Sequence, residues 1–278
     1  MGGFAGAKEL RGQLVLGTAT LGLHAAMRSR DGDIATIRAA YEAGIRAFDT
    51  ARVYSPVGDP LYAESLLADA LYGLDDLVVM TKGGHFRTPD GGFGVDNSPA
   101  RLRQDVEDSL RALRTDRIDL YLLHRADDES VPIEDSVAEL VRLRAEGKVA
   151  EIGVSNVRLD QLRAALDVAP IVAVQNQYSP LNTAWDPVSR EECIAVIAEC
   201  EARGLVYLAY SPLKTDGPAI VELRPDLMNR TRSHEASVLA EIFAVSPAMA
   251  IITGASRAET VRDAATASAS DRPASHRS

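Results

Sequence analysis

The sequence predicts an α/β fold, a single (β/α)8 TIM barrel, from three observations. Eight short apolar segments are spaced along the chain, amphipathic helical patterns lie between them, and no G-x-G-x-x-G turn follows the first segment. Strands that are buried on both faces by helices are almost wholly apolar, and such strands pair in parallel. Alternation of this kind over 278 residues is typical of a parallel barrel. The alternative is an open doubly wound sheet, which usually begins with the missing glycine-rich turn.

The expected strands are short segments rich in β-branched and other apolar residues. They lie at residues 14–17, 47–50, 77–81, 118–124, 151–154, 171–175, 206–210 and 249–252. Among the helices, one is expected to begin at Ser98 and Pro99, which read as an N-cap followed by proline at the first helical position. Another helical pattern covers 190–203, and Gly204 is expected to end it.

One domain is expected over residues 1–278, with a disordered tail at 267–278 that is rich in Ala, Ser and Arg. Residues 87–97 contain proline and three glycines and predict a flexible loop after the third strand, at the end of the barrel where active sites lie. The segment between the seventh and eighth strands is short and has room for one clear helix, at about 234–244.

The charge and composition exclude several classes of partner. A net charge of −10 argues against affinity for nucleic acid or anionic membranes. Since no apolar run is long enough to span a bilayer and no signal peptide is seen, a cytoplasmic protein is expected. Cys193 and Cys200 lie seven residues apart in a helical pattern, too far for a disulfide, and are expected to be small core residues. No metal site is predicted, and the oligomeric state is left open.

Ionisable residues stand at the ends of three consecutive expected strands. Asp49 ends the second strand and is followed by Tyr54, Lys82 ends the third, and His124 ends the fourth. The carboxyl ends of barrel strands carry the catalytic groups in this fold. These four side chains are therefore expected to converge on one pocket.

The chemistry that such a set supports is acid catalysis with an electrostatic partner. Tyrosine is a poor acid at its ordinary pKa of about 10. A nearby ammonium from Lys82 lowers that pKa towards neutrality, and Asp49 orients Lys82. His124 is placed to donate a hydrogen bond to a carbonyl oxygen that becomes negative during reduction.

Each of these residues alone has a structural explanation. Asp49 at a strand end is more often a helix cap or loop anchor, and Lys82 alone is more often a solvated surface group. His124 alone is more often a satisfied structural histidine, and Tyr54 a core aromatic whose hydroxyl reaches water. Their joint placement on adjacent strand ends favours the functional interpretation.

The motifs around these residues resemble the aldo-keto reductase family, in the family's order and spacing, over roughly residues 14–266. They are Phe48-Asp49-Thr50-Ala51 with Tyr54, Thr81-Lys82-Gly83-Gly84-His85, Asp119-Leu120-Tyr121-Leu122-Leu123-His124-Arg125, Gly153-Val154-Ser155-Asn156, Val174-Gln175 and Ala209-Tyr210-Ser211-Pro212-Leu213. The resemblance implies a barrel, a nicotinamide cofactor and a four-residue catalytic group.

The resemblance also implies roles for individual residues. The catalytic group falls on Asp49, Tyr54, Lys82 and His124. The expected cofactor is NADPH, with NADH as the alternative. The implied contacts are Thr18, the nicotinamide-amide residues Ser155, Asn156 and Gln175, the ring-stacking Tyr210, the pyrophosphate residues Ser211 and Leu213, and the adenosine residues Ser256 and Arg257.

The chain departs from the family pattern near the cofactor. Residues 214–232 contain only Gly217 where the family has a glycine-rich loop over the pyrophosphate. Thr260 stands where relatives often have an arginine, and Asp263-Ala264 replaces their usual Glu-Asn pair. Looser cofactor binding and a modest NADPH preference are expected, with Arg257 as the candidate for the 2′-phosphate.

The leading functional hypothesis is an NAD(P)H-dependent oxidoreductase that reduces an aldehyde or ketone, with the proton supplied by Tyr54. One alternative is a non-catalytic redox sensor or regulatory subunit that binds the cofactor on the same fold. Another is a Schiff-base lyase that uses Lys82 as a nucleophile. The small-molecule substrate is expected to be hydroxylated or sugar-like, because the residues expected at the barrel mouth are largely polar. These are Arg52, His85, Phe86, Arg125 and Trp185.

Overall fold

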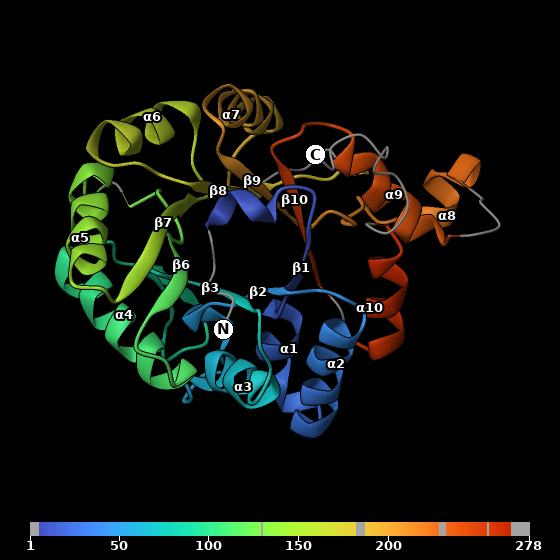
Figure 1. The fold of residues 1–278 in the computed structure, drawn as a ribbon, viewed down its shortest axis with the longest axis horizontal. Helices are drawn as coiled ribbons and strands as arrows, with labels where there is room; N and C mark the ends of the chain where they lie inside the picture. Colours follow the sequence, from blue (N-terminus) through green and yellow to red (C-terminus); the bar gives the residue numbers. More distant parts are fainter. Residues whose placement is uncertain (1–5, 129, 182–186, 228–231, 255, 268–278) are drawn as a thin grey trace.

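The computed structural model describes residues 6–128, 130–181, 187–227, 232–254 and 256–267. Eight parallel strands close into a barrel, seen nearly end-on in Figure 1. They are β1 (Leu14–Gly17), β2 (Ala47–Asp49), β3 (Val78–Gly83), β6 (Ile118–Leu123), β7 (Val149–Ser155), β8 (Ala173–Gln177), β9 (Val206–Tyr210) and β10 (Met249–Gly254). Each pairs with its neighbours in chain order, and β10 pairs with β1. The predicted TIM barrel is confirmed, and the open sheet is wrong.

Helices form an outer ring around the strands (Figure 1). The longer ones are α2 (Arg30–Glu42), α3 (Tyr62–Leu71), α4 (Pro99–Leu113), α5 (Ile133–Ala145), α6 (Leu159–Val168), α7 (Arg190–Arg203), α9 (His234–Phe243) and α10 (Ala258–Ala265). Shorter pieces are α1 (Ala19–Leu23), α8 (Ile220–Leu223) and the 3₁₀ turns η1 (Ala7–Leu10), η2 (Ala25–Met27), η3 (Arg52–Tyr54) and η4 (Pro225–Leu227).

Two helix boundaries follow directly from the sequence. The side chain of Ser98 accepts a hydrogen bond from the Arg101 amide at 3.3 Å, and proline follows it, so α4 begins where expected. Gly204 ends α7 with φ of +69°, a left-handed conformation that glycine adopts without steric cost.

Strand alternation divides the core into two parts. Along β2, Ala47 points into the barrel and Phe48 points out against the helices. The interior cluster also contains Met80 and Leu122, and η1 closes it with Ala7 and Leu10. Because side chains alternate with a period of two, the residue two positions after each interior apolar side chain also points inward. The barrel therefore has an apolar base below its carboxyl-terminal end.

The segment expected to be a loop after the third strand contains a β-hairpin. Strands β4 (His85–Arg87) and β5 (Phe93–Val95) pair in antiparallel fashion, with Phe86 opposite Gly94. A Cβ at Gly94 would lie 2.6 Å from the Phe86 ring, so only glycine leaves room for this aromatic side chain. The proline and glycine content predicted a flexible loop over 87–97, and the pairing of β4 with β5 was not predicted.

The segment between β9 and β10 contains α9, close to the expected helix, together with the one-turn α8 and η4. Cys193 and Cys200 are both free and buried, as predicted. Of the expected tail, Ala267 is buried, and residues 268–278 lie outside the described part of the chain. Among the helices described, none is both long and apolar enough to cross a bilayer.

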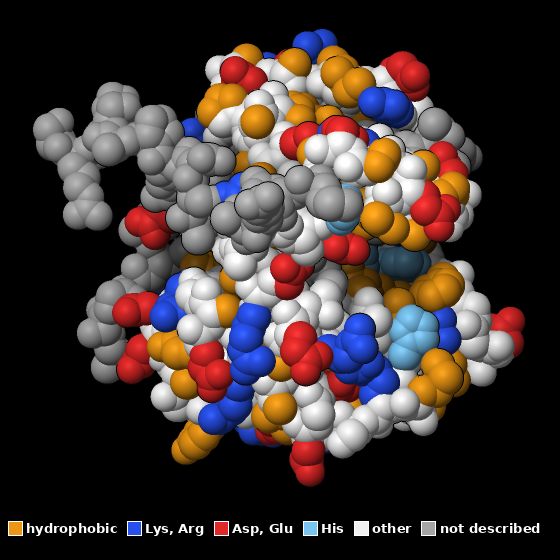
Figure 2. All heavy atoms as spheres, turned by 90° about the vertical axis from the view of Figure 1, so that its right-hand side faces the viewer, with side chains coloured by type: hydrophobic (Ala, Val, Ile, Leu, Met, Phe, Trp, Pro, Cys, Tyr) orange, Lys and Arg blue, Asp and Glu red, His pale blue; other side chains and the backbone are white. Residues whose placement is uncertain are grey.

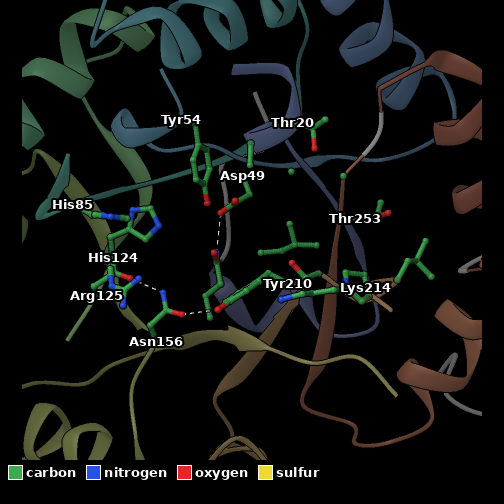
Figure 3. A pocket seen from close by; sticks show the side chains of 18 of the residues that line it. Thr20, Asp49, Tyr54, His85, His124, Arg125, Asn156, Tyr210, Lys214 and Thr253 are labelled. Atoms are coloured by element: carbon green, nitrogen blue, oxygen red, sulfur yellow. Dashed lines mark hydrogen bonds between the residues drawn. The ribbon is translucent and has the colours of Figure 1, made fainter. Parts of the chain in front are cut away.

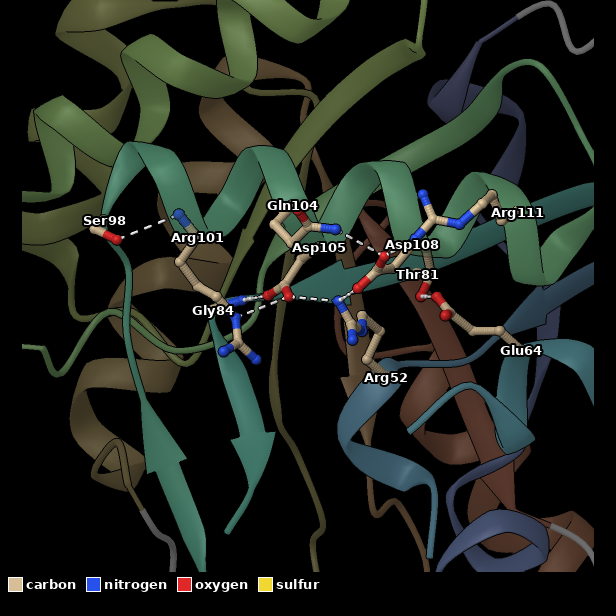
Figure 4. A network of polar contacts seen from close by, with 10 residues as sticks. All are labelled: Arg52, Glu64, Thr81, Gly84, Ser98, Arg101, Gln104, Asp105, Asp108 and Arg111. Carbon is tan, nitrogen blue, oxygen red and sulfur yellow. Dashed lines mark hydrogen bonds and ion pairs between the residues drawn. The ribbon is translucent and has the colours of Figure 1, made fainter. Parts of the chain in front are cut away.

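A buried carboxyl group lies on the outer side of β3. Glu64 of α3 is fully buried and accepts a hydrogen bond from the hydroxyl of Thr81 at 2.6 Å (Figure 4). Burial raises the pKa of Glu64 to about 7, although the Thr81 hydrogen bond opposes the shift. Removing a carboxylate from water disfavours its charged form.

Glu64 should therefore make stability fall as pH rises. A pKa raised from 4.5 to about 7 in the folded state gives a contribution that is complete below pH 4.5 and is lost as pH rises through 7. The free energy of unfolding should fall by about 3 kcal/mol as pH rises through this range, and we expect Glu64→Gln to remove this fall. Urea unfolding across this range measures it, with the exposed Glu222→Gln as control. Parallel pH dependence for wild type and Glu64→Gln would contradict the prediction.

Candidate active site

Three of the predicted site residues point into the barrel because of strand alternation. Asp49 lies two residues after the interior Ala47, Lys82 two after Met80, and His124 two after Leu122. All three are buried, and they lie just above the apolar base of the barrel. Figure 3 shows Asp49 and His124 facing one cavity together with Tyr54.

Lys82 makes three hydrogen bonds in the barrel interior. Its Nζ donates to Asp49 Oδ2 at 2.8 Å, to the Thr50 carbonyl at 2.9 Å and to Tyr54 Oη at 3.1 Å. Burial alone lowers the pKa of a lysine, but attraction to Asp49 and Tyr54 outweighs it here and raises the pKa of Lys82. Lys82 is therefore a charged ammonium held by three hydrogen bonds. A Schiff-base lyase needs a neutral amine as its nucleophile, so this state of Lys82 argues against that alternative.

Tyr54 lies on η3, directly after the loop that follows β2. Its pKa is raised above the ordinary value, since burial outweighs the lowering effect of Lys82. The expectation of a tyrosine near neutrality is therefore wrong for this structure. The sequence shows the cation but not the loss of water around the phenol, which disfavours the tyrosinate.

His124 and His85 lie side by side at the cavity wall. Their rings are 5.0 Å apart, edge to face, and the His124 ring is 5.7 Å from that of Tyr54. Burial, together with Lys82, His85 and Arg125, lowers the pKa of His124 well below its ordinary value. Burial and Arg125 lower the pKa of His85 to about 4. Both imidazoles are neutral at physiological pH and each carries one N–H.

The residues expected to hold the nicotinamide form a hydrogen-bonded group that adjoins Asp49 and His124. Gln175 Nε2 donates to Asp49 Oδ1 at 2.9 Å, so Asp49 is held from both oxygens. Asn156 Nδ2 donates to the His124 carbonyl at 2.8 Å, and the hydroxyl of Tyr210 donates to Asn156 Oδ1 at 2.7 Å. The Ser155 hydroxyl donates to the Gln175 carbonyl at 2.7 Å. The structure brings all four of these residues together.

A cavity of about 430 Å³ opens above the four candidate catalytic residues. In the space-filling view the molecule is hollowed at the right, where a histidine side chain is visible in the depression (Figure 2). The lining includes Asp49, Tyr54, His85, His124, Asn156, Gln175, Tyr210, Ser211 and Leu213. Thr20 and Lys214 also line it and were not predicted (Figure 3). Lys214 directly follows a predicted residue, whereas nothing in the sequence singled out Thr20.

Two predicted cofactor residues lie behind this surface. Thr18 is fully buried, and its hydroxyl donates to the Asp49 carbonyl at 3.1 Å. Ser155 is also buried, and neither residue is part of the cavity wall. Both side chains hold residues that do line the cavity, namely Asp49 and Gln175.

The two adenosine-end candidates lie at a second cavity, of about 420 Å³, where the first turns of α2 and α10 meet. Ser256 and the exposed Arg257 line it together with Arg28, which the sequence analysis missed. Arg28 donates to the Ser256 carbonyl and to buried Asp33, both at 2.7 Å. At the position that departs from the family's Glu-Asn pair, Asp263 accepts from the hydroxyl of Ser233, the N-cap of α9.

The expected mouth residues divide between two places. His85 and Arg125 line the main cavity. Arg52 and Phe86 instead line a separate hollow between η3 and the β4–β5 hairpin. Trp185 lies outside the described residues.

Comparison with known proteins agrees with this fold. The family model of the Aldo/keto reductase family matches residues 13–268. An uncharacterised oxidoreductase of Schizosaccharomyces pombe is 30% identical over 238 residues, 85% of this chain and 74% of that protein. A probable aldo-keto reductase of Glycine max is 36% identical over 204 residues, 71% of this chain and 55% of that protein.

Solved structures give the same result. A glycerol dehydrogenase from Gluconobacter oxydans has a TM-score of 0.76 at 27% identity, covering 90% of this chain and 85% of that one. An aldo-keto reductase from Klebsiella pneumoniae in complex with NADPH has a TM-score of 0.74 at 26% identity, covering 94% and 87%. The chain belongs to the aldo-keto reductase family of oxidoreductases.

The Lys82–Asp49 pair generates a prediction about stability. Lys82→Met leaves the Asp49 carboxylate buried without its cation, which typically costs about 3–5 kcal/mol. We expect Lys82→Met to lower the free energy of unfolding by this amount, and Lys82→Met/Asp49→Asn to recover most of it. The loss should be smaller at acidic pH, because the unpaired Asp49 then takes up a proton. Urea unfolding of the three proteins measures it, and equal losses for the single and double variants would contradict it.

Proposed function

We propose that this protein is an NADPH-dependent carbonyl reductase that converts an aldehyde or ketone to an alcohol, with Tyr54 as the proton donor. The supporting observation is the hydrogen bond from Lys82 Nζ to Tyr54 Oη at 3.1 Å. The lysine ammonium can donate hydrogen bonds but cannot accept them, so the phenol oxygen of Tyr54 is the acceptor of this bond. The hydroxyl hydrogen of Tyr54 therefore remains available to a carbonyl oxygen in the cavity.

The other site residues act on the developing alkoxide and on its proton. Lys82 stabilises the tyrosinate that remains after transfer, and Asp49 keeps Lys82 charged. His124 is neutral and lies beside Tyr54, so its N–H is a suitable second donor to the same carbonyl oxygen. A bound nicotinamide supplies the hydride. Asn156, Gln175 and Tyr210 would hold it against this wall of the cavity.

The polarity of the cavity supports a hydroxylated or sugar-like substrate. Besides the candidate catalytic residues, His85, Arg125 and Thr20 line it. Hydroxyl groups on a substrate satisfy such side chains, whereas a large apolar substrate leaves them unpaired. The similar structure from Gluconobacter oxydans is named a glycerol dehydrogenase, and glycerol is a small hydroxylated molecule, which agrees with this assignment.

A non-catalytic sensor is the alternative on this fold. It requires cofactor binding without turnover, whereas the hydrogen bonds from Lys82 to Asp49 and Tyr54 favour proton transfer. Turnover of a panel of aldehydes, ketones and hydroxylated carbonyl compounds, followed by NADPH absorbance, decides between the two. Binding of NADPH with no turnover on any compound would favour the sensor.

Tyr54→Phe should abolish reduction and leave NADPH affinity nearly unchanged, because only the transferable proton is lost. Positioned acid catalysis contributes roughly 10²–10⁴-fold, so kcat should fall by that factor. Steady-state kinetics and cofactor fluorescence measure the two quantities. Tyr72→Phe, at a surface tyrosine on the C-cap of α3, is the matched control. If Tyr54→Phe retains about half of wild-type turnover or more, Tyr54 is not the acid.

Arg257 should bind the 2′-phosphate, the group that distinguishes NADPH from NADH. It stands at the N-cap of α10, where helix amides and the partial positive charge of the helix end also favour an anion. Asp33 and Glu259 at the same cavity oppose a further negative charge, so we expect a modest preference for NADPH.

Arg257→Ala should weaken NADPH binding by about 1.5–3 kcal/mol, the value of a charged hydrogen bond, and hardly affect NADH. Fluorescence titration of both cofactors tests this. Arg262→Ala, on the same helix but outside the cavity, removes the same charge as a control. Equal losses for NADPH and NADH would show that Arg257 does not contact the phosphate.

A further inference from the structure

A buried carboxylate on α4 contacts the two chain segments that carry Tyr54 and Lys82. Asp105 is fully buried, and its Oδ2 accepts from the Gly84 amide at 2.9 Å. Its Oδ1 accepts from Arg52 Nη1 at 2.7 Å and from Arg101 Nε at 2.8 Å. Figure 4 shows the three donors converging on this one side chain.

The Arg52 contact leads to Tyr54. Arg52 and Tyr54 are the first and last residues of the three-residue turn η3. Arg52 Nη1 also lies 2.6 Å from Asp108 Oδ2, one turn further along α4. Only 12% of the Arg52 side chain is exposed, so the ion pairs are largely shielded from water. The turn that carries Tyr54 is thereby fastened to α4 at its first residue.

The Gly84 contact leads to Lys82. Gly84 follows the end of β3, two residues after Lys82. A Cβ at Gly83 would lie 2.9 Å from Asp105 Cβ and 2.1 Å from Tyr121 Oη, so the glycine allows α4 to approach this strand end closely. The Asp105 carboxylate therefore holds the strand end through a hydrogen bond and through direct packing.

Several charged and polar groups surround the buried Asp105. Burial raises the pKa of Asp105 above its ordinary value, and the Gly84 amide, Arg52 and Arg101 oppose this shift without cancelling it. Glu64 of α3 and Tyr121 of β6 also face this group from the neighbouring elements. When a buried charge loses one of its hydrogen-bond partners, the chain segment that supplied that partner is no longer held to it.

We propose that Asp105 and Arg52 are positioning residues that set the Tyr54–Lys82 distance by fastening η3 and the end of β3 to the same side chain. This inference rests on the proposed function, because that distance matters only if Tyr54 transfers a proton. Misplacement of a reacting group by about 1 Å can cost 10²-fold in rate. Neither residue touches the cavity that holds the candidate catalytic groups.

The decisive variant is Asp105→Asn, which keeps the shape of the side chain. An amide has one acceptor oxygen, so its NH₂ must face either the Gly84 amide or Arg52, and one of the two segments is released. We expect kcat to fall roughly 10- to 100-fold, with the Kd for NADPH within about twofold of wild type. Circular dichroism and thermal unfolding establish that the variant is folded.

The pH profile separates positioning from other effects. Reduction requires protonated Tyr54, so kcat is lost as pH rises through the pKa of this residue. Lys82 lowers that pKa, so a Tyr54 that moves away from Lys82 has a higher pKa and the loss shifts to higher pH. Simple removal of the negative charge of Asp105 would instead lower the pKa of Tyr54 and shift the loss to lower pH. An upward shift supports the proposal, and a downward shift or no shift overturns it.

Arg52 and Arg101 give matched variants on the same carboxylate. Arg52→Leu should reproduce the loss in kcat, and Arg52→Lys should restore much of it, because a single ammonium can contact both Asp105 and Asp108. Arg101→Gln removes the third donor, which comes from α4 itself, and should retain wild-type kcat. Equal losses for Arg52→Leu and Arg101→Gln would contradict the proposal. The Arg52 series also tests it if Asp105→Asn does not fold.

A second measurement distinguishes this inference from the proposed function. If wild type reduces no carbonyl compound, the proposed function fails. The tyrosinate absorbance of Tyr54, obtained by subtracting the titration of Tyr54→Phe, still reports its pKa without a substrate. An upward shift of this pKa in Asp105→Asn then supports the positioning role of Asp105 on its own, and an unchanged titration rejects it.

Discussion

The site depends on one buried cation that has just enough partners. Lys82 has three ammonium hydrogens and three acceptors, from Asp49, Thr50 and Tyr54. Two of these acceptors keep the lysine charged although its side chain is fully buried, and the third is the proposed acid. Because all three ammonium hydrogens are used, a phenol oxygen that moves away leaves one of them without its acceptor. Gln175 completes the arrangement by holding the second oxygen of Asp49.

The barrel supplies this arrangement through its simplest regularity. Interior positions recur every second residue along a strand, so the same alternation that buries Ala47, Met80 and Leu122 also turns Asp49, Lys82 and His124 inward. The apolar layers exclude water from below, and the same exclusion moves the pKa values of Tyr54 and His124. Packing and chemistry at this site thus have a common geometric cause.

Much of the fold and of the candidate site could be predicted from the sequence, for physical reasons. Runs such as 206–210 are apolar because both faces are covered, and capping residues such as Ser98 and Gly204 act locally. The pKa of Tyr54 was not predictable, because burial depends on every surrounding element. Nor was the convergence on Asp105, since Arg52 lies 53 positions away in sequence. Arg28 was missed for the same reason, since its partner Ser256 is 228 positions distant.

The β4–β5 hairpin stands apart from the barrel in its hydrogen bonding, since its two strands pair with each other in a sheet of their own. It nevertheless begins at His85, which lines the cavity. A change that moves the hairpin would therefore move His85 without breaking a hydrogen bond between strands of the barrel. One wall of the cavity is thus carried by an element whose strand pairing is independent of the barrel that holds the candidate catalytic groups.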